Sequence, residues 1–220
     1  MQILKRYRMI IYSILFICIL ILIGYNVFAY KKTKSIEIFR KKIVNEELPI
    51  KDNISTIDFD LLRKKYKNND IVGAIRIKNE NFERIVFNNK DNTYYMNHNF
   101  LKKKGSGEIF IENNASLDKS KIIILNTKGT NCNEYLKKYN DEQYYLNHKY
   151  IEIESYEYIY TYEVISLYSG NIDSDNIDYE DIFKKSITTY SLDLDEEDNI
   201  LIINSIINNK EISIIAKKVK

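Results

Sequence analysis

Apolar and polar residues alternate with a period of two along most of the chain after residue 70, and this pattern predicts β-strands. The segment 71–78 shows the alternation first, and shorter β-rich runs recur at 108–112, 121–125, 150–154, 158–168, 200–207 and 211–219. Asn, Asp and Gly residues between the runs are typical of turns. Helical spacing interrupts the strands at 134–147 and 179–188. We therefore expect a mainly β (α+β) fold, a largely antiparallel closed barrel with two helical insertions, because closure hides strand edges.

The N-terminal part of the chain has a different pattern. Residues 9–30 carry no charged side chain, and as a helix of about 33 Å they are long enough to cross a hydrocarbon core of ~30 Å. A cleaved signal peptide is the alternative, but its apolar region is typically only ~7–15 residues long. Basic residues flank the segment on both sides, so the charges do not decide its orientation. We expect one retained transmembrane helix at 9–30, after a cytoplasmic N-terminus at 1–8.

Two further helices are predicted before the first strand. Apolar residues at helical spacing over 35–47 indicate a juxtamembrane helix that ends near Pro49, within a linker at 31–54. Ser55 and Thr56 are suitable N-cap residues for a second helix that ends near 68–70. The globular domain is accordingly expected at 55–220.

Composition narrows the function. A net charge of +2 gives no strongly basic face, so we expect no nucleic-acid partner. Cys18 lies in the predicted span and Cys132 in the globular part, so the two cannot form a disulfide within one folded chain. Two histidines in separate segments do not have the ligand spacing of a zinc site, and we expect neither a metal nor another cofactor.

Several short sequence motifs occur in an order that resembles that of the class B sortases. Asp70-Ile71-Val72-Gly73 matches the family's first strand, and Gly107-Glu108-Ile109-Phe110-Ile111 matches a glycine-led strand. Residues 123–127 take the place of the strand that ends in Tyr-Gly-His, and residues 200–205 that of the strand that ends in Leu-Ser-Thr-Cys. The resemblance covers roughly residues 55–219. It implies a sortase-like β-barrel on the outer side of a bacterial cell membrane.

The resemblance also implies where the reacting groups of a sortase would lie. Sortases use a cysteine nucleophile, a histidine and an arginine, and the matching positions here hold Ser205, Thr127 and Glu211. A threonine hydroxyl does not titrate near neutral pH, a serine needs an adjacent base, and a carboxylate opposes a developing oxyanion. A shift of one residue would place Lys210 at the arginine position, but it restores neither nucleophile nor base.

These replacements imply a catalytically inactive surface protein that binds sorting-signal peptides or other surface proteins. The alternative is an enzyme of altered chemistry that uses Ser205, with His98 or His148 as its base. Cys132 as a relocated nucleophile is less favoured, because no basic residue adjoins it in the sequence to lower its pKa.

Overall fold

The computed structural model describes residues 54–112, 114–172, 177–191 and 194–219, which all belong to a compact unit, Ile50–Lys220. The predicted span 9–30 and the predicted helix 35–47 lie outside the described residues. Among the helices that are described, none is both long and apolar enough to cross a membrane.

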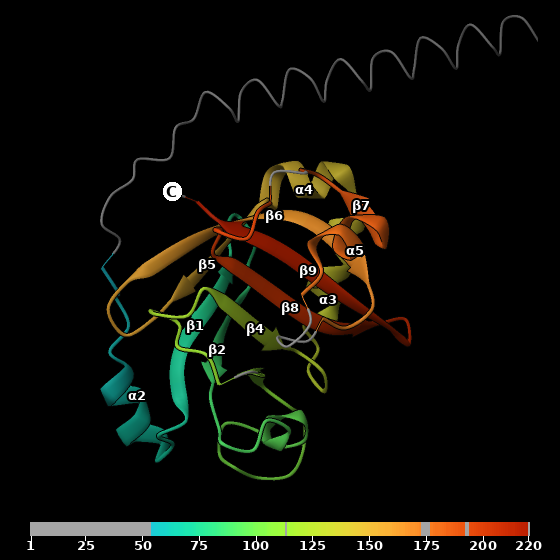
Figure 1. Cartoon of the computed structure of the whole chain (residues 1–220). Coiled ribbons are helices and arrows are strands. Elements are labelled where there is room, and N and C mark those ends of the chain that lie inside the picture. Colours follow the sequence, from blue (N-terminus) through green and yellow to red (C-terminus); the bar gives the residue numbers. More distant parts are fainter. Residues whose placement is uncertain (1–53, 113, 173–176, 192–193, 220) are drawn as a thin grey trace, which may run out of the picture. The chain divides into compact units, whose positions relative to one another are not determined.

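Nine strands of the described chain form one sheet that closes on itself (Figure 1). The strand order is β5-β1-β2-β3-β4-β8-β9-β6-β7, and an additional pairing of β5 with β6 closes an eight-stranded barrel, with β7 attached to β6 outside the ring. The strands are β1 Ile71–Ile77, β2 Glu83–Phe87, β3 Ile109–Ile111, β4 Ile122–Asn126, β5 Tyr150–Glu154, β6 Ile159–Ser169, β7 Ser186–Thr189, β8 Ile200–Ile207 and β9 Lys210–Lys218. The closed mainly β barrel predicted from the sequence is confirmed.

Most strand pairs are antiparallel, but two are parallel. The parallel pairs are β2 with β3 and β4 with β8. The second of these aligns Asn126 at the end of β4 with Asn204 in β8. Since β8 also pairs with β9 in antiparallel orientation, the ends of β4 and β8 and the start of β9 meet at one place in the barrel.

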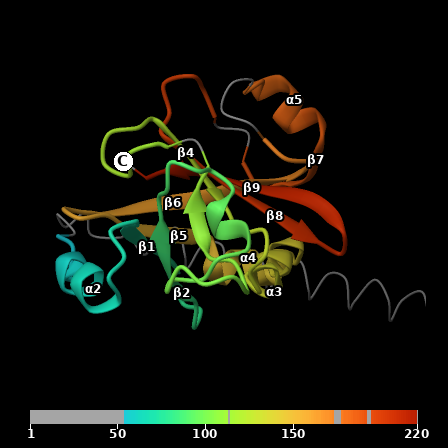
Figure 2. The same cartoon turned by 90° about the horizontal axis from the view of Figure 1, so that it is seen from below.

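Short helices lie outside the barrel (Figure 2). They are α2 Phe59–Tyr66, α3 Asn133–Leu136, α4 Glu142–His148 and α5 Tyr179–Lys184, with 3₁₀ turns at Tyr94–Met96 and Lys137–Asn140. The first predicted insertion, 134–147, is therefore helical but broken at Asp141, whose side chain caps α4. The second, 179–188, is partly wrong, because its last residues form β7 on the edge of β6.

The predicted start of the helix near residue 55 is also wrong. Asp58 is the N-cap of α2 and accepts a hydrogen bond from the N–H of Leu61. Ser55 and Thr56 instead donate to the buried carboxylate of Glu154 at the end of β5, with distances of 2.9 Å from Ser55 Oγ and 2.6 Å from Thr56 N. A partner about a hundred residues away in the sequence therefore takes the hydroxyls that would otherwise suit a cap.

Two strands, β2 and β7, were not predicted from the sequence. The first is a five-residue strand that begins with two charged residues, and the second is a four-residue strand with three hydroxyl side chains. Neither carries the alternation that a longer, half-buried strand shows, so only their pairing with β1 and β6 identifies them.

The run Ile200–Ile203 in β8 is apolar at every position because both faces of the strand are covered. Ile200 and Ile202 pack with Ile172 and with Ile182 of α5 on the outer face. Leu201 and Ile203, which alternate with them, face the inside of the barrel and are fully buried. We call these two sets the outer row and the inner row of β8.

Candidate functional site

The polar residues that follow the apolar run Ile200–Ile203 in β8 belong to different rows. Asn204 continues the outer row of Ile200 and Ile202, and Ser205 continues the inner row. The same alternation in β9 places Ser213, which pairs with Asn204, on the outer face, and Glu211 two residues earlier lies on that face too. Ser205 and Glu211 therefore point to opposite faces of the sheet.

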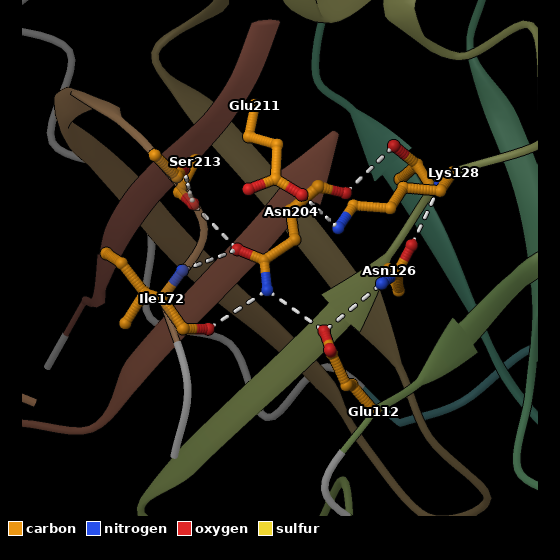
Figure 3. Close-up of polar contacts among 9 residues, drawn as sticks. Glu112, Asn126, Lys128, Ile172, Asn204, Glu211 and Ser213 are labelled. Carbon is orange, nitrogen blue, oxygen red and sulfur yellow. Dashed lines mark hydrogen bonds and ion pairs between the residues drawn. The ribbon is translucent and has the colours of Figure 1, made fainter. Parts of the chain in front are cut away.

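Asn204 is the centre of a hydrogen-bonded cluster, shown in Figure 3. Its Nδ2 donates to Glu112 Oε2 at 2.9 Å and to the carbonyl of Ile172 at 3.0 Å. Its Oδ1 lies 2.6 Å from Ser213 Oγ and 3.4 Å from the N–H of Ile172. We call Glu112, Asn126, Asn204, Ser213 and the backbone of Ile172 the Asn204 network. Because Asn204 is fully buried, these contacts replace the water that its amide would otherwise bind.

The network extends to the end of β4 and to the surface. Glu112 Oε2 also accepts from Asn126 Nδ2 at 3.2 Å, and Asn126 Oδ1 accepts from the N–H of Lys128 at 2.9 Å. Lys128 Nζ forms an ion pair of 2.7 Å with Glu211 Oε1, and the Glu211 side chain is half exposed. The outer face is thus exposed to solvent at the ion pair, whereas it is fully buried at Asn204.

Thr127 immediately follows β4 and lies next to β8. Its N–H and its Oγ1 both approach the carbonyl of Asn204, at 2.9 and 3.1 Å. Its own carbonyl accepts from the N–H and the Oγ1 of Thr130. Thr127 is buried, and these bonds give its hydroxyl a structural role in the turn.

Ser205 is buried as well, and its Oγ has no hydrogen-bond partner among the described residues. The two histidines are engaged elsewhere: Nδ1 of His98 lies 2.8 Å from the carbonyl of Tyr94, and Nδ1 of His148 lies 2.8 Å from that of Tyr144. Each ring also stacks on the tyrosine that it contacts. No serine–histidine pair therefore forms within the described part of the chain.

Cys132 lies in the loop after Thr127, beside a cavity of about 270 Å³ that Arg84, Glu108 and Asn131 also line. The Cys132 side chain is 1% exposed and therefore fully buried. Burial raises the pKa of the Cys132 thiol, which is the opposite of what a thiolate nucleophile needs.

The three positions chosen from the sequence are therefore only partly assembled. Thr127 and Ser205 lie at the neighbouring ends of β4 and β8, but the side chain of Glu211 is on the other face. Lys210, the alternative arginine position, is the exposed first residue of β9 and pairs with Ile207. In the described segments, no group of three or more His, Cys, Asp and Glu side chains is arranged to hold a metal ion.

Sequence reasoning missed Asn126, Asn204 and Ser213, which form the buried polar cluster. The available signal was the period of two: Asn204 shares a face with Ile202 and not with Ser205. The contacts of these residues with Glu112 and Ile172 come from distant parts of the chain and have no local signature.

Comparisons with known proteins place this architecture in a class. No protein-family model matches the chain. A protein of Listeria monocytogenes named sortase B is 28% identical over 170 residues, which are 69% of each chain. The crystal structure of Clostridium perfringens sortase B is 25% identical, with a TM-score of 0.60 over 72% of this chain and 100% of that one. Staphylococcus aureus sortase B is 23% identical, with a TM-score of 0.64 over 86% and 96%.

The chain therefore has the class B sortase fold, as its sequence motifs predicted. Among known proteins, it is similar to the sortase B of Listeria and of Clostridium, in sequence over about two thirds of its length and in structure over a little more.

Proposed function

We propose that this protein is a membrane-anchored, sortase B-like surface module that binds a peptide or protein partner and does not catalyse transpeptidation. The observation that carries the proposal is the Asn204 network. It fills the place where β4, β8 and β9 meet with two carboxamides whose hydrogen bonds are directed at the protein itself.

The face on which the side chains lie supports this reading. A nucleophile and its base must come within hydrogen-bond reach of each other, and the oxyanion partner must face the same cleft. Thr127 and Ser205 do not share a face with Glu211, whereas Asn126 and Asn204 do. We infer that Asn126 and Asn204, one residue earlier in each strand, stand in the histidine and cysteine positions of the fold. A neutral carboxamide neither accepts a proton near pH 7 nor acts as a nucleophile, so both alignments give an inactive centre.

The anchor and the location are part of the same proposal. Residues 9–30 span the cell membrane once, and the domain that follows lies outside the cell. Long segments translocate largely regardless of flanking charge, so the basic residues after the span are compatible with this orientation. The class B sortase fold supports this location, because the resemblance to that family implies a barrel on the outer side of the cell membrane.

Binding is tested with the full-length chain in mild detergent, immobilised and exposed to sorting-signal peptides and to an active sortase. We expect binding at the open end of the outer face, where Ile206 is 40% exposed and precedes the turn to Glu211. Ile206→Glu should weaken it. Ile187→Glu on β7 is the matched control, because Ile187 is similarly exposed but lies on the edge strand. If neither peptide nor sortase binds, the binding role is wrong.

One observation favours an enzyme as a second candidate. The Ser205 hydroxyl is buried and has no hydrogen-bond partner among the described residues, so no contact in this part of the chain competes with a group that a substrate would bring to activate it. The full-length chain is incubated with a sorting-signal substrate and hydroxylamine, and wild type is compared with Ser205→Ala. Turnover that disappears in the variant would establish the enzyme, and turnover absent from both proteins would leave the binding module.

A further inference from the structure

An exposed apolar surface surrounds the point at which the described chain begins. We call it the hairpin patch: Ile54, Leu61 of α2, and Tyr156 and Tyr158 of the turn between β5 and β6. These side chains are 69%, 60%, 50% and 45% exposed. Ile54 forms a β-bridge with Tyr158, and the ring of Tyr156 lies 6.4 Å from that of the α2 residue Phe59. In Figures 1 and 2, α2 lies beside this hairpin and far from α5 and β7.

The hairpin patch stands on a rigid base. Glu154 is fully buried beneath it and accepts hydrogen bonds from Ser55 Oγ and from the N–H groups of Thr56 and Ile57, at 2.6–2.9 Å. Arg76 Nη1 forms an ion pair of 2.5 Å with the same carboxylate. Residues 55–57 are therefore tied to the end of β5, which holds the backbone of Ile54 beside Tyr158.

The chemistry of the hairpin patch suits a lipid headgroup region. Tyrosine combines an apolar ring with a polar tip and is enriched where hydrocarbon meets water. Lys64, Lys65 and Lys67 are exposed on the same helix and its C-cap, and they would attract anionic lipid. Three carboxylates lie nearby, and two of them are engaged: Asp58 caps α2, and Asp60 accepts from the Tyr156 hydroxyl and pairs with Arg63. The third, Glu157, is exposed between Tyr156 and Tyr158, and the three lysines outnumber it.

The position of the hairpin patch along the chain indicates which surface it contacts. Ile54 lies near the N-terminal end of the compact unit Ile50–Lys220, and the sequence before that unit includes the uncharged segment 9–30 and basic residues such as Lys31, Lys32 and Lys34. We propose that the hairpin patch docks onto the phospholipid surface of the membrane in which residues 9–30 are anchored. This inference rests on the anchor in the proposed function and is independent of peptide binding. Docking would point α5 and β7, at the other end of the domain, away from the bilayer (Figure 1).

The absence of tryptophan from the sequence allows a direct test. The full-length chain carrying Tyr158→Trp is reconstituted into phosphatidylcholine–phosphatidylglycerol vesicles, with and without lipids brominated near the headgroup. The matched control is Ile187→Trp, because Ile187 is 49% exposed on β7 at the far end of the domain. An interfacial side chain lies about 5–10 Å into the headgroup boundary, within reach of such a quencher.

We expect the Tyr158→Trp protein to float with the vesicles and to lose several times more emission to the brominated lipid than the Ile187→Trp protein. Adding Leu61→Glu to Tyr158→Trp should reduce this quenching while flotation persists. Flotation with equal or absent quenching at both positions overturns the docking and leaves the anchor intact. A chain that does not float overturns the anchor and the docking together. Neither result bears on peptide binding, which is measured separately.

Discussion

The sharpest prediction compares two adjacent residues of β8 that face opposite sides of the sheet. Asn204→Ala removes a buried carboxamide that contacts three other segments of the chain. Ser205→Ala removes a buried hydroxyl that has no hydrogen-bond partner among the described residues. The first change should destabilise the fold, and the second should not.

The expected loss of unfolding free energy in Asn204→Ala depends on which hydrogen bonds each partner of Asn204 retains. Without Asn204, Glu112 Oε2 retains the bond from Asn126, and Ser213 Oγ can donate its single hydrogen to the Gly170 carbonyl at 2.8 Å. The N–H and the carbonyl of Ile172 lose the hydrogen bonds that they form with the Asn204 side chain. Each buried group left unpaired costs about 1–3 kcal/mol, and the 3.4 Å contact of the N–H falls at the low end, so the total is roughly 3 kcal/mol.

The assay is urea unfolding of the full-length chain in mild detergent, followed by circular dichroism, together with thermal unfolding. For a chain of this size, a loss of about 3 kcal/mol lowers Tm by roughly 6–12 °C. Ser205→Ala is the matched control and should leave the free energy of unfolding unchanged or raise it by up to about 1 kcal/mol, because it removes an unpaired polar atom.

Two results would refute this reasoning. An Asn204→Ala protein within about 0.5 kcal/mol of wild type, the usual range for surface changes, would mean that the Asn204 network contributes nothing to stability. A larger loss for Ser205→Ala than for Asn204→Ala would mean that the Ser205 hydroxyl is the bonded one, and the assignment of Asn204 to the nucleophile position would fall with it.

Three further predictions concern other groups. Burial alone would raise the pKa of Glu154, but hydrogen bonds from Ser55, Ile57 and Thr56 and the Arg76 pair outweigh it and lower that pKa. Its contribution to stability is therefore complete above its ordinary pKa of 4.5 and lost as pH falls through the lower folded value. Urea unfolding between pH 6 and 3 should show this loss, and a Glu154→Gln protein with the same pH slope would contradict it. In a Cys18→Ser background, Cys132 should react with a thiol reagent far more slowly when folded than in urea; equal rates would show that it is accessible. Glu211→Gln breaks a half-exposed ion pair with Lys128 and should change the free energy of unfolding by no more than about 1 kcal/mol, measured by the same method.

Much of the fold was predictable because the pattern is strong where strands are long and buried. The predicted strands at 150–154 and 200–207 match β5 and β8, and the others mentioned above differ from the structure by about one residue at either end. Long apolar runs are set by burial, which acts on the whole strand and leaves a signal in the sequence. The resemblance to class B sortases added the class of barrel, whereas the order of the strands around it came from the structure.

The local errors have a common origin in distant contacts. Ser55 and Thr56 have the chemistry of helix caps, yet the Glu154 carboxylate engages them and the helix begins after Asp58. Residues 186–188 follow α5 with helical spacing, yet β6 offers them a strand partner. Propensity expresses a weak preference, and a partner far along the chain overrides it.

For the candidate site too, part was determined by the sequence and part only by the tertiary structure. The sequence by itself determined that no cysteine, histidine or arginine stands at the ends of the three strands, since residue identity needs no coordinates. Only the tertiary structure decided which of these residues share a face: the parallel pairing of β4 with β8 and the antiparallel pairing with β9 place Asn126, Asn204 and Ser213 together and turn Ser205 inward. When two sequences are aligned with a shift of one residue, their motifs can still be recognised. The shift nevertheless assigns a side chain to the opposite side of the sheet, because successive residues of a strand point in opposite directions.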